Sequence, residues 1–296
     1  MKQRIATIAR TKEILERYGL YTKKGYGQNF IIEPAIVEKI ATAAVEDEDC
    51  FVIEVGPGIG ALTECLCQRS NHVVAFEIDK RMPPVLKAEI DSSGLEIILQ
   101  DFLEVDIDQV IQTYRKNEQK VVFVSNLPYY ITTPILFKLF EAKESIESIT
   151  VMMQKEVGQR FLAGENEKEY NALSVIWQYK CDVKKVTDVS RHVFWPSPRV
   201  DSVVLQFRFH HRYQVKDEAL FFALVKACFT QRRKTLYNNL QTFLKDKALA
   251  AKCLEQAGIE LNRRAQQCTV EDFIHLYEVN YEDICACKGE SVLGCS

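Results

Sequence analysis

The sequence predicts an α/β fold built on a mainly parallel sheet, followed by a small all-helical C-terminal domain. Two observations predict this class. Up to about residue 210, short apolar runs rich in β-branched residues alternate with segments of helical period, as in chains that build βαβ units. From Asp217 onward the period is helical throughout, and proline is absent.

The predicted elements follow in chain order. Seven strands are expected over residues 51–55, 73–78, 95–99, 121–125, 149–153, 173–179 and 203–209. Four helices, each beginning near a proline, a glycine or a polar cap, are expected over 34–45, 61–69, 84–90 and 134–141. In the last part of the chain, Leu220, Leu224 and Cys228 share one helical face, which predicts a helical domain. The change of pattern places the junction between the α/β domain and this helical domain at residues 210–215.

Composition excludes several classes of protein. The 296 residues are 47% hydrophobic and 27% charged, which is typical of a globular chain. No run approaches the roughly eighteen uncharged apolar residues of a membrane span, and the first residues lack the apolar core of a secretory signal. The ten cysteines are therefore expected as reduced cytoplasmic thiols. Cys285, Cys287 and Cys295 lack the paired spacing of a zinc site, so we expect no metal and assign this tail no role.

Charge is unevenly distributed in a chain whose net charge is −3. Residues 1–28 carry seven Lys or Arg against two Glu, a local charge of +5, and Arg232, Arg233 and Lys234 form a second basic run. Basic stretches on an acidic body fit a polyanionic partner that is met by one face. They are equally compatible with solvated helix faces, and charge alone does not choose between the two.

A glycine-rich loop follows the first strong strand run. Glycines at 56, 58 and 60 separate that strand from a helix, and they allow the backbone to approach a ligand closely. The third glycine arrives one residue too early for the dinucleotide fingerprint, and no Lys-Ser or Lys-Thr follows as in a P-loop. An ordinary strand-to-helix turn is the alternative.

Acidic residues end the next two predicted strands. The second strand run ends in Glu77-Ile78-Asp79, and a carboxylate at its tip can accept both hydroxyls of a ribose. Asp101 can accept a hydrogen bond from an adenine amino group, and the ring of Phe102 can pack on the base. Three strand ends thus supply a glycine loop, a ribose acid and an adenine acid in order, and this set suits S-adenosylmethionine better than NAD. Two surface acids are the alternative interpretation.

The fourth strand ends in a possible base-binding sequence. The Asn126 amide oxygen and the Pro128 carbonyl could together hold an exocyclic amine, and Tyr129 could stack on a flat base. A proline-stiffened loop at 193–202 presents Phe194 and Trp195, either of which could form the opposite face of a base sandwich. A simple turn and hydrophobic packing under a hairpin are the respective alternatives.

Together these motifs resemble the ribosomal RNA adenine dimethyltransferases, most closely the bacterial branch that modifies small-subunit (16S) rRNA. The resemblance covers nearly the whole chain and implies a Rossmann-like class I S-adenosylmethionine-dependent methyltransferase sheet. It rests on residues 27–30, 54–60, 76–79, 100–102, 126–129, 154–157, 194–202 and 231–235. The chain departs from the family pattern at Ile31, where Leu is usual, and at Asn171, where Gly is common.

The resemblance also implies roles for individual residues. Those implied to bind the cofactor are Gln28, Asn29, Ile31, Gly56, Gly58, Glu77, Asp101, Phe102 and Asn126. Asn126 and the Pro128 carbonyl would align the target amine, while Tyr129 and Phe194 would stack on the flipped adenine. Docking on RNA would fall to Lys23, Lys24, Arg232, Arg233 and Lys234.

The implied activity is methyl transfer from S-adenosylmethionine to N6 of two adjacent adenines near the 3′ end of small-subunit rRNA, giving dimethyladenosines during ribosome biogenesis. The expected partner is rRNA within a pre-ribosomal particle, met by a cytoplasmic monomer that binds no membrane. The expected domains are a basic N-terminal arm and helix (1–28), a methyltransferase domain (29–210), a helical rRNA-docking domain (211–284) and the cysteine-containing tail (285–296).

Two alternatives remain at this point. A large-subunit (23S) rRNA adenine dimethyltransferase that confers macrolide resistance would usually carry Ile and Asn where this chain has Leu127 and Asp201. A non-catalytic ribosome assembly factor could share the fold, although the intact Glu77, Asp101 and Asn126 argue against lost activity.

Overall fold

The computed structural model describes residues 3–20, 29–127, 131–142 and 146–292, with side chains described as far as residue 287. The chain divides into two compact units, each described by itself below. The first comprises Met1–Gly158 and Lys184–Phe209, and the second comprises Gln159–Val183 and His210–Ser296. The division at residue 210 coincides with the change in sequence pattern, whereas residues 159–183, expected in the α/β domain, lie in the second unit.

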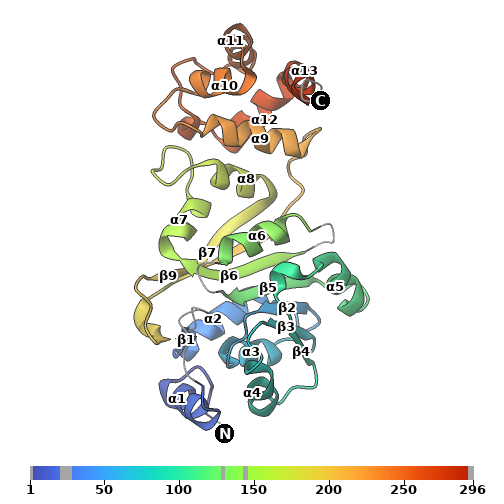
Figure 1. Ribbon diagram of the computed structural model, residues 1–296, viewed down its shortest axis with the longest axis vertical. Coiled ribbons are helices and arrows are strands. Elements are labelled where there is room, and N and C mark those ends of the chain that lie inside the picture. Colours follow the sequence, from blue (N-terminus) through green and yellow to red (C-terminus); the bar gives the residue numbers. More distant parts are fainter. Residues whose placement is uncertain (1–2, 21–28, 128–130, 143–145, 293–296) are drawn as a thin grey trace. The chain divides into compact units, whose positions relative to one another are not determined.

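The α/β class is confirmed by a seven-stranded sheet in the order β4-β3-β2-β5-β6-β9-β7 (Figure 1). Its strands are β2 (Phe51–Val55), β3 (Val73–Glu77), β4 (Leu95–Leu99), β5 (Val121–Asn126), β6 (Ser148–Gln154), β7 (Cys181–Val189) and β9 (Ser202–Phe209). Strands β2 to β6 pair in parallel, and β9 runs antiparallel to β6. Because β2 pairs with both β3 and β5, β2 is an interior strand of the sheet.

Burial explains why these runs form strands. Every residue of β2 and β3 is buried, as expected for parallel strands that are covered on both faces. Edge strand β4 is half exposed. The predicted helices are confirmed within a few residues as α2 (Pro34–Ala44), α3 (Ala61–Cys67), α4 (Met82–Glu89) and α6 (Thr132–Phe140). The first unit also contains α1 (Ile8–Arg17) and α5 (Ile107–Tyr114).

A separate two-stranded sheet was not predicted from the sequence. It pairs β1 (Phe30–Ile31) with β8 (Phe194–Trp195) in antiparallel register. Ile32 N also donates to the Val193 carbonyl at 2.9 Å. This pairing joins the residues just before α2 to the proline-rich loop more than 160 positions later (Figure 1).

The predicted strand at 173–179 is wrong, because these residues form helix α8 (Ala172–Lys180). The Asn171 side chain accepts from Leu173 N at 2.8 Å, and Ser174 Oγ accepts from Asn171 N at 3.1 Å, so the helix begins at a capping box. Buried Val, Ile, Trp and Tyr side chains in this run resemble a buried strand in sequence. The strand is β7, which follows the helix directly.

Beyond β9 the described residues form helices and connecting turns. The α-helices are α9 (Glu218–Cys228), α10 (Leu236–Leu244), α11 (Lys247–Gln256), α12 (Val270–Val279) and α13 (Tyr281–Val292). Helix α7 (Lys155–Leu162) precedes α8. Among the described residues, none of the helices combines the length and the apolar character that crossing a bilayer requires.

Candidate active site

A pocket in the first unit gathers the carboxyl ends of β2, β3, β4 and β5. Parallel α/β sheets bind ligands at this edge because the loops that follow the strands converge there. Nine of the residues proposed from the sequence line the pocket: Asn29, Ile31, Gly56, Gly58, Glu77, Asp101, Phe102, Asn126 and Phe194. Gln28, Pro128 and Tyr129 lie outside the described residues.

The glycine loop and the acid of the next strand are directly connected. Gly56 and Gly58 have φ values of +71° and +57°, which side chains other than glycine rarely adopt. Gly58 N donates to Glu77 Oε2 at 3.1 Å. A Cβ atom at Gly58 would lie 3.4 Å from the Phe30 ring, so the loop and β1 are in close contact.

The Glu77 carboxylate is oriented by backbone amides. Its Oε1 accepts from Ile78 N at 2.9 Å and from Asp79 N at 2.8 Å, in addition to the bond from Gly58. Burial raises the pKa of Glu77, the three amide bonds oppose that rise, and the Asp79 carboxylate adds to it. A fixed carboxylate at the tip of β3 can accept hydrogen bonds from vicinal hydroxyls.

The end of β4 supplies an acid and an aromatic ring. Asp101 caps a 3-10 turn, η2 (Phe102–Glu104), by accepting from Leu103 N at 2.9 Å. The Phe102 ring is buried and meets Phe76 edge to face, with 5.3 Å between ring centroids. This packing holds the ring in the wall of the pocket, where it can contact a flat heterocycle.

Asn126 is the last residue of β5. It lies opposite Met152 of β6, and the preceding Ser125 Oγ donates to the Val55 carbonyl of β2. That bond ties the ends of two neighbouring strands together. The Asn126 amide therefore reaches the pocket from the rigid end of a strand, beside the glycine loop.

The β1–β8 pair forms another part of the wall. Ile31 lies opposite Phe194, and Phe30 lies opposite Trp195. Phe194 is buried and lines the pocket, whereas Trp195 does not line it and is 40% exposed. Of the two aromatic residues proposed for the base sandwich, the structure thus brings Phe194 to the pocket.

Glu54 is a pocket residue to which the sequence argument gave no role. It lines the pocket from β2, and its Oε2 atom has no hydrogen-bond partner. Burial raises the pKa of Glu54 to about 8, and the nearby Glu77 carboxylate acts in the same direction. Its place two residues before Gly56 was the available signal.

The proposed RNA-binding residues are not part of this pocket. Arg232, Arg233 and Lys234 are exposed in the turn between α9 and α10 of the second unit. Arg232 is held there, because its Nε donates to Gln266 Oε1 at 3.2 Å and its Nη2 donates to the Lys168 carbonyl. Lys23 and Lys24 lie outside the described residues.

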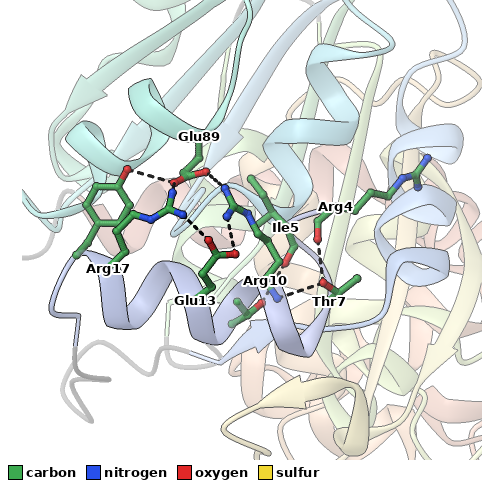
Figure 2. Close-up of polar contacts among 9 residues, drawn as sticks. Arg4, Ile5, Thr7, Arg10, Glu13, Arg17 and Glu89 are labelled. Atoms are coloured by element: carbon green, nitrogen blue, oxygen red, sulfur yellow. Dashed lines mark hydrogen bonds and ion pairs between the residues drawn. The ribbon is translucent and has the colours of Figure 1, made fainter. Parts of the chain in front are cut away.

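The basic N-terminal arm forms ion pairs within its own unit. Arg4 pairs with Glu38 at 3.1 Å, and Arg17 pairs with Glu89 at 3.0 Å. Arg10 pairs with Glu89 as well (Figure 2). Each of these arginines is ion-paired; Arg10 is also buried, whereas the side chains of Arg4 and Arg17 remain about half exposed. Among the residues with described positions, no cluster of His, Cys, Asp or Glu suits a metal ion.

Comparison with known proteins gives a consistent result. The family model described as "Ribosomal RNA adenine dimethylase" matches residues 19–281. A protein named Ribosomal RNA small subunit methyltransferase A from Staphylococcus haemolyticus is 45% identical over 281 residues, covering 93% of this chain and 95% of that protein. A protein of the same name from Bacillus mycoides is 45% identical over 279 residues, covering 92% and 96%.

Two solved structures are similar over most of the chain. A dimethyladenosine transferase from Plasmodium falciparum has a TM-score of 0.72 at 26% identity and covers 86% of this chain and 98% of its own. The 23S rRNA methyltransferase ErmE has a TM-score of 0.66 at 26% identity and covers 85% and 99%. With its pocket, its fold and a family match over most of its length, the chain belongs to the ribosomal RNA adenine dimethylase family.

Proposed function

We propose that this chain transfers methyl groups from S-adenosylmethionine to N6 of adenines in small-subunit rRNA, forming dimethyladenosine. One observation carries the proposal: the ends of four adjacent strands bring a glycine loop, Glu77, Asp101 with Phe102, and Asn126 around a single pocket. The relatives named small subunit methyltransferase A, at 45% identity over nearly their full length, support the choice of small-subunit rRNA.

The pocket residues fit the parts of the cofactor. The amide-oriented Glu77 carboxylate suits the two ribose hydroxyls, and Asp101 with the Phe102 ring suits an adenine. Gly56 and Gly58 leave room for a ligand against the backbone, and Asn29 and Ile31 would contact the methionine portion. When bound, S-adenosylmethionine supplies an electrophilic methyl group on its sulfonium.

The chain's own residues would align the acceptor. The lone pair of adenine N6 is delocalised into the ring, so the amine is a weak nucleophile. Two acceptors on its hydrogens, the Asn126 amide oxygen and the Pro128 carbonyl, would favour a pyramidal nitrogen with its lone pair directed at the methyl group. Tyr129 and Phe194 would hold the flipped base between their rings. Orientation and electrostatics would supply most of the rate gain, without a general base.

The protein would bind its rRNA substrate within a ribosomal particle. We infer that two adjacent adenines near the 3′ end of small-subunit rRNA are the targets, within a pre-ribosomal particle, and that a monomer acts on them in the cytoplasm. The exposed Arg233 and Lys234 of the second unit would contact RNA phosphates. Residues 29–210 would carry the chemistry and the helical residues 211–284 the docking.

The direct test measures transfer of labelled methyl groups into small ribosomal subunits that lack this modification, with protein-free large-subunit rRNA in parallel. We expect label in small subunits, recovered as dimethyladenosine, with two methyl groups on each of two adenines. Label in large-subunit rRNA alone would move the assignment to the resistance branch. Cofactor binding without transfer to either RNA would favour a non-catalytic assembly factor.

The Asn126→Ala variant tests the chemistry within the same assay. If Asn126 holds the amine, the rate of transfer should fall at least about a hundredfold, since one preorganised polar contact is removed from the transition state. The protein should still fold, because Asn126 is partly exposed at the end of its strand. A near wild-type rate would remove Asn126 from the mechanism while leaving the assignment of the substrate intact.

A further inference from the structure

The N-terminal segment is attached to three helices of the first unit, each time through a carboxylate. Arg4 Nη1 lies 3.1 Å from Glu38 of α2, and Ile5 N donates to Glu64 of α3 at 3.1 Å. Glu89, the last residue of α4, receives side chains from α1 (Figure 2). Each arginine of this arm is therefore ion-paired with a carboxylate of the first unit.

The Glu89 carboxylate is the centre of this attachment, and its side chain is 1% exposed. It accepts from Arg10 Nη2, from Arg17 Nη1 at 3.0 Å and from the Tyr18 hydroxyl at 3.2 Å. Glu13 of α1 bridges the two arginines and lies 2.7 Å from Arg10. Buried ion pairs add little net stability compared with apolar packing, so the effect expected of this cluster is to fix the orientation of α1 on α4.

Helix α1 also contacts the wall of the pocket. Lys12 Nζ lies 4.7 Å from the centroid of the Trp195 ring, on β8. Trp195 pairs with Phe30, and the neighbouring pair is Ile31 with Phe194. Three of these four residues, Phe30, Ile31 and Phe194, line the pocket. A sheet with two residues in each strand has little stability of its own and depends on what packs against it.

Helix α4, to which Glu89 attaches α1, also lies against the glycine loop. Leu86 and Ile90 lie so close to Gly60 that a Cβ there would be 2.9 Å and 2.7 Å from their terminal methyl carbons. Glu89 stands between these two contacts in sequence. Helix α4 thus packs on the glycine loop and also carries the carboxylate that holds α1.

We propose that α1 is an internal brace of the pocket. Glu89 fixes α1 on α4, and Lys12 on α1 then supports the β1–β8 wall through Trp195. Glu89 and Lys12 are positioning residues, and the arginines of the arm serve this attachment rather than contact with RNA. The proposal rests on the proposed function only in naming S-adenosylmethionine as the ligand of the pocket.

The two tryptophans provide a readout that does not involve the cofactor. Trp177 is fully buried and Trp195 is 40% exposed, so acrylamide quenching of the fluorescence reports mainly on Trp195. In Glu89→Gln we expect quenching to increase well below the melting temperature, because α1 no longer keeps Lys12 over the ring. The control is Glu46→Gln, which removes an exposed ion pair with Arg208 at 2.5 Å and should leave quenching unchanged.

Cofactor affinity is measured on the same proteins by calorimetry. We expect Glu89→Gln and Lys12→Met each to raise the dissociation constant for S-adenosylmethionine about fivefold. The double variant should be no weaker than the more affected single variant, since both residues act through one brace. Lys12 is exposed, so Lys12→Met decides the question if Glu89→Gln does not fold.

The outcomes separate the brace from the proposed function. If Glu89→Gln lowers the melting temperature but leaves quenching and affinity within twofold of wild type, Glu89 is merely structural and the brace is overturned. Independent, additive losses from Glu89→Gln and Lys12→Met would overturn it too. If wild type and Glu46→Gln both fail to bind S-adenosylmethionine, the proposed function fails, and the quenching result alone then supports or overturns the brace.

Discussion

Glu77 illustrates how much of the site depends on one side chain. Three backbone amides orient its carboxylate, so Glu77→Gln would place an NH₂ group against at least one N–H donor. Hydrogen bonds to charged groups contribute about 1.5–3 kcal/mol each, so we expect affinity for S-adenosylmethionine to fall by roughly ten- to a hundredfold in calorimetry. Glu96→Gln, an exposed acid on the neighbouring strand β4, is the control. Equal affinities in both variants would exclude Glu77 as a ribose ligand.

Glu54 predicts a dependence of stability on pH. Its pKa is raised from a usual value of 4.5 to about 8, so the folded protein keeps a proton that the unfolded chain loses between those values. Stability should therefore fall as pH rises from about 4.5 to 8. Glu54→Gln cannot ionise, and we expect it to exceed wild type by on the order of 2–3 kcal/mol at pH 7 and to lose this advantage near pH 4.5.

Urea unfolding at pH 5, 7 and 8 measures the effect of Glu54→Gln, with Glu96→Gln again as the control because Glu96 is exposed. A difference between Glu54→Gln and wild type that stays constant across this range would mean that Glu54 titrates normally in the folded protein.

At the scale of elements, Gly60 is the position where the glycine loop packs most closely against helix α4. It has φ of +95°, and an added Cβ would meet Ile90 and Leu86 at less than 3 Å. We expect Gly60→Ala to lower the free energy of unfolding by about 2–3 kcal/mol, from backbone strain together with displaced side-chain ends. Chemical denaturation measures it.

Two other glycines separate the contributions at Gly60. Gly19 has φ of +59° with nothing within 4 Å of an added Cβ, so Gly19→Ala should show the backbone strain alone, about 1 kcal/mol. Gly164→Ala, with neither a positive φ nor a close neighbour, should be close to neutral. If Gly60→Ala costs no more than Gly19→Ala, the contact with α4 is not tight.

The elements also show where sequence patterns suffice. Strands β2, β3 and β5 are short, largely apolar runs that end at a glycine or polar turn, as expected for strands that are buried on both faces, and their prediction is confirmed. Helix α8 is buried on most of its surface, so its run of Val, Ile, Trp and Tyr carries no amphipathic period. The capping box at Asn171 was the available local signal for a helix.

For the whole molecule, the parts of the site that could be predicted lie at, or just beyond, the carboxyl ends of strands. Glu77, Asp101 and Asn126 could be placed because parallel strands bring their ends to one edge. The β1–β8 wall could not, since strands of two residues have no period to detect. The Arg10–Glu89 pair joins residues 79 positions apart, and no local pattern encodes such a contact.

The charge of the whole chain predicts how its proposed binding to RNA depends on salt concentration. With a net charge of −3, the protein must bind a polyanion through local cations, and binding should weaken as salt increases. Each cation that neutralises a phosphate adds roughly 0.7–0.9 to the slope of log affinity against log salt. Arg233 and Lys234 are exposed in the helical unit, whereas Arg4 is paired with Glu38 at 3.1 Å.

We therefore expect Arg233→Ala with Lys234→Ala to reduce the salt slope for small-subunit binding by about 1.5, with unchanged affinity for S-adenosylmethionine. Arg4→Ala should change the slope by less than this, because Arg4 is already ion-paired with Glu38. Binding of small subunits measured across a salt titration decides this. A slope that falls for Arg4→Ala and stays constant for the Arg233 and Lys234 variant would move the RNA-binding surface from the helical unit to the N-terminal arm.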